Sequence, residues 1–136
     1  MKKIKFLLIS FMFSFWSFNL NAADWTMASG YPKSNFHTQN IMKFIDEVKA
    51  NTSVNINLNP NDTLIKLDAI KTSLQRGQIP IGEIRFGIYG NEDPMYILAG
   101  LPFIAPDYAS AWLLKEVKHE YLQNLFNKKG LRILYT

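Results

Sequence analysis

Five side chains suited to binding an organic anion follow three apolar stretches of the chain. Tyr31 and His37 follow the first stretch, Lys66 follows the turn after the second, and Glu83 and Arg85 end the third. A guanidinium donates two parallel hydrogen bonds to a carboxylate, which an ammonium cannot do, so Arg85 is the strongest candidate. Polar groups at the ends of buried strands are typical of ligand crevices in α/β proteins. The pattern therefore predicts a site for a negatively charged small molecule.

These residues also have plainer structural interpretations. Arg85 has two acidic neighbours in the sequence, Glu83 and Glu92, and an ion pair with either would be structural. His37 follows several N-cap candidates, which is typical of a capping or surface histidine. Lys66 falls on a predicted helix, where a lysine usually leaves its charge in solvent. The sequence leaves these alternatives open.

Patterns that would indicate catalysis or a metal centre are missing from the sequence. The chain has no cysteine, so neither a thiolate metal site nor a cysteine nucleophile is possible. His37 and His119 fall on different predicted elements, and no GxSxG, HExxH or phosphate-loop glycine pattern occurs. The acidic cluster at residues 91–93 precedes Pro94 and is better interpreted as a turn than as metal ligands. We therefore expect a binding protein without cofactor or metal, and an exported hydrolase is the weakest alternative.

The order of apolar patterns predicts an α/β fold. Residues 24–28, the alternating run 54–58 and the apolar run 79–84 have the composition of strands. Helical patterns separate them, so the chain contains two βαβ units. Such units form a mostly parallel sheet flanked by helices, with ligands at the carboxyl ends of the strands.

Two helices are predicted between these strands. The first has apolar residues at i, i+3, i+4 and i+7, counted from Ile41. The second is expected to begin at Asp62 or Thr63 and to end before Gly77, where a helix C′ glycine belongs. Its expected buried face consists of Leu67, Ile70 and Leu74.

The last third of the chain predicts a long helix and a further strand. Residues 105–107 have the pattern of a helix start, with an acidic residue near the positive end of the dipole. Gly130 is expected to end this helix, and residues 131–135 are expected to form a strand. The expected apolar stripe of the helix is Ala109, Trp112, Leu113, Val117, Tyr121, Leu122, Leu125 and Phe126. Because the chain ends directly after that strand, we expect residues 23–136 to be a first domain, truncated before a second.

Residues 1–22 have the pattern of a secretory signal peptide. Three lysines precede an apolar run, and small residues suit cleavage after Ala22 or Ala23. The run is short for a membrane-spanning helix, which needs about 20 residues, so an uncleaved anchor is the less favoured alternative. We therefore expect an exported, periplasmic protein.

The composition argues against a nucleic-acid partner. Three of the lysines behind the formal charge of +4 lie in residues 1–22, so the rest of the chain carries only +1. A near-neutral domain lacks the basic surface that nucleic acid requires. A hydrophobic content of 48% predicts a sizeable core instead.

An ordered series of segments resembles a known family. The series is YPKSNFHTQNIMKFIDEV, then an Asn-Pro turn, then LQRGQIPIGE, YGNEDP and LPF. From Trp25 to its end, the chain resembles the periplasmic solute-binding subunits of tripartite ATP-independent periplasmic (TRAP) transporters, of the dicarboxylate-binding type. It resembles only their N-terminal part.

The resemblance implies a two-domain clam-shell that closes on an organic acid and then docks on the permease subunits of the transporter. Each domain of such a protein is α/β, and this chain would supply the first. The main carboxylate-clamping arginine of the family would lie beyond Thr136. The position of Arg85 often holds an acidic residue in that family, so an arginine here would change selectivity. The alternative is a truncated fragment that binds no ligand, or an interaction module whose exposed apolar surface requires a partner.

Overall fold

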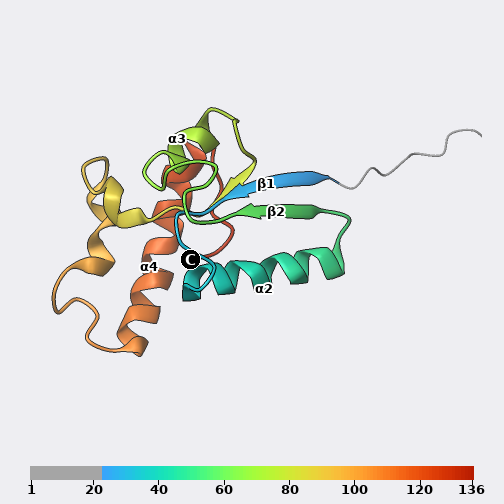
Figure 1. The fold of residues 1–136 in the computed structure, drawn as a ribbon. Helices are drawn as coiled ribbons and strands as arrows, with labels where there is room; N and C mark the ends of the chain where they lie inside the picture. The colour runs from blue at the N-terminus through green and yellow to red at the C-terminus, as the bar shows by residue number, and fades with distance from the viewer. Residues whose placement is uncertain (1–22) are drawn as a thin grey trace, which may run out of the picture.

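A three-stranded parallel sheet organises residues 23–136, which are the part of the chain described by the structure, a computed structural model (Figure 1). Both neighbouring strand pairs run parallel, in the order β2-β1-β3, and helices pack on both faces. The strands are β1 (Asp24–Ala28), β2 (Asn55–Asn59) and β3 (Ile81–Gly82), and the helices are α2 (Phe36–Asn51), α3 (Ile70–Gln75) and α4 (Tyr108–Asn127). The predicted α/β class is confirmed. The signal peptide expected over residues 1–22 lies outside the described residues.

Consecutive side chains of β1 supply the core on the two faces of the sheet. Met27 packs with Ile41 of α2, and its neighbour Ala28 packs with Ile70 of α3. Successive residues of a strand point to opposite faces, so one short strand holds a helix on each side. The sheet thus becomes the middle layer of three.

The boundaries of α2 follow from local capping. The side chain of Asn35 accepts a hydrogen bond from the backbone N–H of His37 at 2.9 Å, as expected of an N-cap residue. The helix ends at Thr52, whose N–H and hydroxyl both donate to the carbonyl of Val48. Its inner face packs on the sheet as predicted, through Ile41, Phe44, Ile45 and Val48.

The prediction that the second helix begins at Asp62 or Thr63 was wrong, because α3 begins only at Ile70. Asn61 and Asp62 have φ angles of 58° and 57°, which a right-handed helix cannot contain. The Asp62 carboxylate accepts from the N–H of Leu67 at 2.9 Å and holds this segment as a turn. The predicted end of the helix is confirmed, since Gly77 follows it with a φ of 68°.

The third strand is shorter than its apolar run predicts. Only Ile81 and Gly82 pair with β1, opposite Met27 and Ala28. Pro80 offers no N–H to a ladder, and β1 ends at Ala28, so neither end can extend. The chain then continues through three 3-10 turns, η2 (Phe86–Tyr89), η3 (Pro94–Tyr96) and η4 (Leu98–Gly100).

The long helix α4 is capped by Asp107, whose carboxylate accepts from the N–H of Ser110 at 2.7 Å. Leu122 and Phe126 are buried against the rings of Tyr89 and Tyr96, as the stripe predicts. The N-terminal half of the predicted stripe was wrong, because its members Ala109, Trp112, Leu113 and Val117 are exposed. Tyr121 is also exposed, but its hydroxyl donates to the Asp93 carboxylate at 2.8 Å. No helix within the described residues is both long and apolar enough to cross a membrane.

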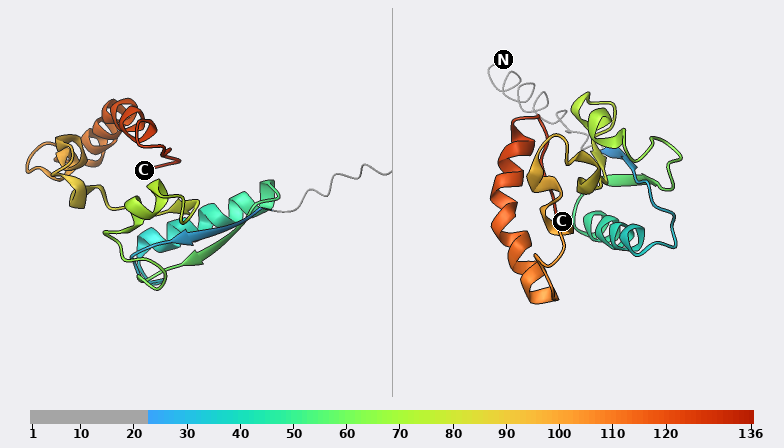
Figure 2. Two further views of the ribbon diagram at one scale, coloured as in Figure 1. Left: turned by 90° about the horizontal axis from the view of Figure 1, so that it is seen from above. Right: turned by 90° about the vertical axis from the view of Figure 1, so that its left-hand side faces the viewer.

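The strand predicted over residues 131–135 does not form. The two-residue β3 leaves no long edge with which this segment can pair. After α4 the chain instead returns toward α2 without secondary structure (Figure 2). Tyr135 contacts Phe44 of α2, with ring centroids 5.2 Å apart. This returning segment becomes one wall of the cavity described below.

A partly buried ion-pair network joins α3, the loop after β3 and the segment directly after α4. The Lys71 ammonium bonds to one oxygen of the Glu92 carboxylate, and Lys129 bonds to the other at 2.5 Å. Asp93 caps η3 by accepting from the N–H of Met95 at 2.9 Å. The acidic cluster at residues 91–93 is therefore a structural turn, as predicted.

Candidate functional site

A cavity of about 1050 Å³ lies between α2, the end of β3 and the segment that follows α4. Four of the five predicted site residues line it: Tyr31, His37, Glu83 and Arg85. The fifth, Lys66, lines a separate hollow of about 300 Å³, beside Asp62 and Asp68. The structure thus brings together the residues that follow β1 and β3, and leaves out the one that follows β2.

Glu83 is held at the end of β3, beside the end of β1. Its backbone N–H donates to the carbonyl of Ala28 at 2.9 Å. The hydroxyl of the buried Ser29 donates to Oε2 of Glu83 at 2.5 Å, and His37 Nδ1 lies 3.9 Å from Oε1. The side chain of Glu83 is only 15% exposed, so its carboxylate is fixed in direction at the wall of the cavity.

The loop after β1 fixes Tyr31 and His37 next to this carboxylate. The carbonyl of Tyr31 accepts from the N–H of Asn61 at 2.9 Å and from the hydroxyl of Thr38 at 3.2 Å. The rings of Tyr31 and His37 stack with centroids 4.9 Å apart. Only the backbone of His37 takes part in capping α2, so its side chain is left to line the cavity.

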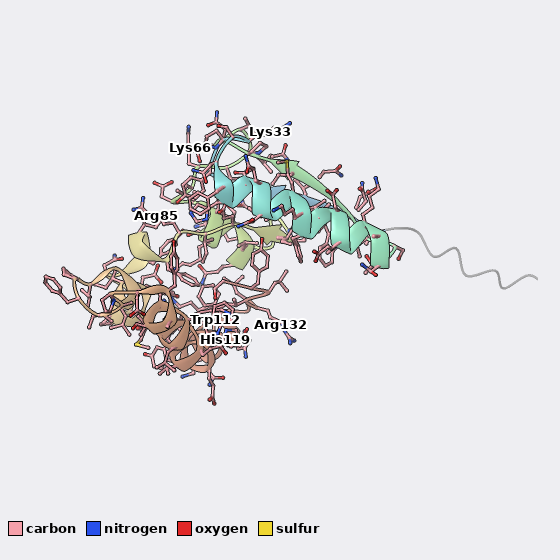
Figure 3. The ribbon with its side chains drawn as sticks, turned by 90° about the horizontal axis from the view of Figure 1, so that it is seen from below. Lys33, Lys66, Arg85, Trp112, His119 and Arg132 are labelled. Carbon is pink, nitrogen blue, oxygen red and sulfur yellow. The ribbon has the colours of Figure 1, made fainter. Side chains whose placement is uncertain are left out.

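Arg85 lies on the rim of the cavity, and its side chain is exposed. Figure 3 shows it at the outer edge of the molecule. The structural alternative for Arg85 was an ion pair with Glu83 or Glu92, and neither pair occurs in the part of the chain that the structure describes. Glu83 instead contacts Ser29 and His37. The guanidinium therefore has no carboxylate partner within residues 23–136.

Sequence reasoning missed the wall formed by residues 130–136. Within this wall, the Tyr135 hydroxyl is influenced by the charge of Glu83. Burial raises the pKa of this hydroxyl, and the negative charge of Glu83 raises it further. Arg132 also lines the cavity, but Figure 3 shows it well apart from Arg85. The only signal for this wall was the alternation of Leu131, Ile133 and Tyr135, which favoured a strand instead.

The remaining lining is mostly apolar and comes from both sheet and helices. Its members include Trp25, Met27, Ile41, Phe44, Leu74, Ile79, Ile81 and Phe126. A polar end beside an apolar wall suits a small molecule with one charged group and a compact body. Within residues 23–136, no group of three His, Cys, Asp or Glu side chains is placed to hold a metal ion.

Neither a model of a known protein family nor a curated protein gives a significant match to this chain. Solved structures do give significant matches. DctP6 of Bordetella pertussis, an extracytoplasmic solute receptor binding pyroglutamic acid, is 34% identical and superposes with a TM-score of 0.80 over 83% of this chain. A marine metagenome TRAP solute-binding protein specific for pyroglutamate is 31% identical, with a TM-score of 0.80 over 85% of this chain. The chain belongs to the TRAP solute-binding protein family.

The match covers only the N-terminal part of these TRAP solute-binding proteins, and this chain spans 38% of the length of each of the two. A more distant member, the ectoine-binding protein of Halomonas elongata, shares the fold with a TM-score of 0.70 at 19% identity. The three-stranded sheet of this chain is therefore a partial domain of a larger two-domain TRAP solute-binding fold.

Proposed function

We propose that this protein is an extracytoplasmic solute-binding protein that delivers an organic anion, a carboxylate, to a TRAP-type secondary transporter. One observation carries the proposal: Tyr31, His37, Glu83 and Arg85 converge on one cavity at the carboxyl ends of β1 and β3. This is the edge at which parallel α/β sheets bind ligands. Membership of the TRAP solute-binding family supports the same conclusion.

The proposal includes partners and location. Residues 1–22 would act as a cleaved signal peptide, and residues 23–136 would be the first domain of a clam-shell in the periplasm. The permease subunits of a TRAP transporter would receive the ligand. The solved relatives are receptors, which supports binding without catalysis as the role of this chain.

The ligand class follows from the cavity and from the relatives. The exposed guanidinium of Arg85 offers a clamp for one carboxylate at the rim. The resemblance predicts a dicarboxylate, whereas three solved relatives above 30% identity bind pyroglutamate, which has one carboxylate and a lactam ring. Both classes belong in the first binding screen.

Calorimetric titration of the full chain with pyroglutamate, malonate and galacturonate tests this function. The parent should bind at least one acid, and Arg85→Ala should weaken that binding roughly ten- to hundredfold, the effect of losing a charge-assisted pair. Lys66→Ala is the matched control, since it removes one positive charge from the separate hollow and should change affinity less than about twofold. If no acid binds, or if Arg85→Ala equals the parent, the proposal fails.

The second candidate function is an interaction module, and one observation favours it. The outer side of α4 exposes Trp112, Leu113 and Val117, each at least 64% exposed. Large exposed apolar side chains gathered on one helix are typical of protein contacts. Self-association in size-exclusion chromatography, together with no binding of any acid, would favour this function over ligand binding.

A further inference from the structure

We infer that Glu83 selects organic acids that carry a hydrogen-bond donor, N–H or O–H, next to the carboxylate, and that it rejects simple dicarboxylates. The inference rests on the proposed function, because it names the substrate class of the same cavity. It assigns Glu83 the role of a specificity-determining residue. Arg85 would bind the ligand carboxylate and Glu83 would bind the neighbouring donor.

The first argument is the rigidity of the Glu83 carboxylate. The Ser29 hydroxyl donates to Oε2 at 2.5 Å, and Ser29 itself is fully buried. The backbone of Glu83 is tied to Ala28 by a 2.9 Å hydrogen bond. A side chain held at both its backbone and its head group presents the second carboxylate oxygen in one direction.

The second argument is the unused acceptor capacity of that second oxygen. His37 Nδ1 lies 3.9 Å from Oε1, too far for a hydrogen bond. A carboxylate has about four acceptor positions, and the described residues fill one of them. Glu83 lines the cavity and its side chain is 15% exposed, so a donor on a bound ligand can reach the open acceptor positions from the cavity.

The third argument is charge. A ligand with a second carboxylate at this place would set two like charges against each other in a partly dry site, which strongly disfavours binding. A lactam or amide N–H, or a hydroxyl, matches the acceptor without this repulsion. Glu83 and Arg85 are separated by one residue, and both line the cavity, so the same cavity offers an acceptor and a cationic donor.

Calorimetry of the full chain with three probes tests the inference. The probes are pyroglutamate, its lactone analogue with oxygen in place of the ring N–H, and malonate. The parent should bind pyroglutamate at least tenfold more tightly than either of the other two. Glu83→Gln keeps the size of the side chain but adds an amide donor, so the preference over the lactone should fall below about threefold or reverse.

Glu47→Gln is the matched control, since it neutralises an exposed acid on α2 that does not line the cavity, and it should keep the full preference. Equal binding of pyroglutamate and the lactone by the parent would overturn the inference while the proposed function stands. Absence of binding for all three acids would overturn the inference, and the proposed function as well if galacturonate also fails to bind. The comparison on the parent needs no variant, so it tests the preference for a donor even if Glu83→Gln fails to fold.

Discussion

Glu92 joins two lysines that approach it from different parts of the chain. Hydrogen bonds from Lys129, and then from Lys71, hold the pKa of the Glu92 carboxyl below its ordinary value. The Lys71 side chain is only 2% exposed, and its ammonium lies 4.0 Å from the centroid of the Tyr89 ring. Without Glu92, this buried charge would keep only its contacts with aromatic faces.

Replacing Glu92 with glutamine should therefore lower the free energy of unfolding. We expect a loss of about 1–2 kcal/mol, less than for a fully buried pair because solvent screens the exposed third of this side chain. Urea denaturation followed by circular dichroism measures it. Glu116→Gln, at an exposed position on α4, should change stability by less than about 0.5 kcal/mol, and an equal loss in both variants would contradict the assignment.

The same carboxylate predicts a pH dependence. The pKa of Glu92 is lower in the folded protein, so its stabilisation is complete above the pKa of the unfolded carboxyl, about 4.3. It is lost as the pH falls through the lower, folded pKa. The stability difference between the parent and Glu92→Gln should accordingly shrink from pH 6 toward pH 3 in urea titrations. A difference that stays constant over this range would exclude the proposed cause.

Four of the predicted site residues line one cavity because they follow strands whose direction is set by βαβ order. Whichever way their side chains rotate, Tyr31, Glu83 and Arg85 must emerge at one edge of a parallel sheet. Lys66 was different, since its position depended on a helix start that proved to be a turn. The selectivity proposed for Glu83 depends on its hydrogen bond with Ser29, a contact between residues 54 positions apart that no local pattern reveals.

At the scale of elements, the predictions that failed are those in which a local pattern lacked a partner. Residues 131–135 are mostly apolar and were predicted as a strand, yet β3 is too short to pair with them. Residues 62–69 have helical apolar spacing, but the left-handed backbone at Asn61 and Asp62 delays the helix to Ile70. Helix ends were predicted better from capping residues. Asn35, Gly77 and Asp107 act within one turn of a helix and need no distant contact.

Gly77 provides a test at this scale. Its φ of 68° is unfavourable for a residue with a side chain, although a Cβ there would meet nothing within 4 Å. Gly77→Ala should destabilise the protein by about 1 kcal/mol through backbone strain alone. Gly87→Ala is the control, since its surroundings are equally open and its φ is not left-handed. Thermal unfolding should separate the two variants, and equal midpoints would refute the assigned strain.

At the scale of the whole molecule, the apolar residues divide into a packed core and an uncovered surface. The core has three clusters, around α2, α3 and the C-terminal half of α4. In the N-terminal half of α4, Trp112, Leu113 and Val117 are each at least 64% exposed among the described residues. Relatives more than twice as long supply further chain, which fits the proposal that this domain is one of two.

Leu113→Lys combined with Val117→Lys should reduce self-association of the chain without loss of stability. Both side chains are about two-thirds exposed, so the substitutions remove surface contacts rather than core contacts. Size-exclusion chromatography over a range of concentrations measures the association. The double variant Lys43→Ala and Lys49→Ala, on exposed positions of α2, should elute as the parent does. A double lysine variant that associates as strongly as the parent would place the contact elsewhere.

Trp25 lines the cavity, whereas Trp112 is exposed to solvent on α4. Because the two indoles are in different environments, the fluorescence of Trp25 can report on the cavity. In a Trp112→Phe chain that begins at residue 23, Trp25 is the sole indole. Its emission would then respond to the polarity of the ligand chamber that this side chain lines. Binding of a ligand that displaces water would shift that emission toward shorter wavelengths, so the fraction of protein with bound ligand can be followed without a dye or label.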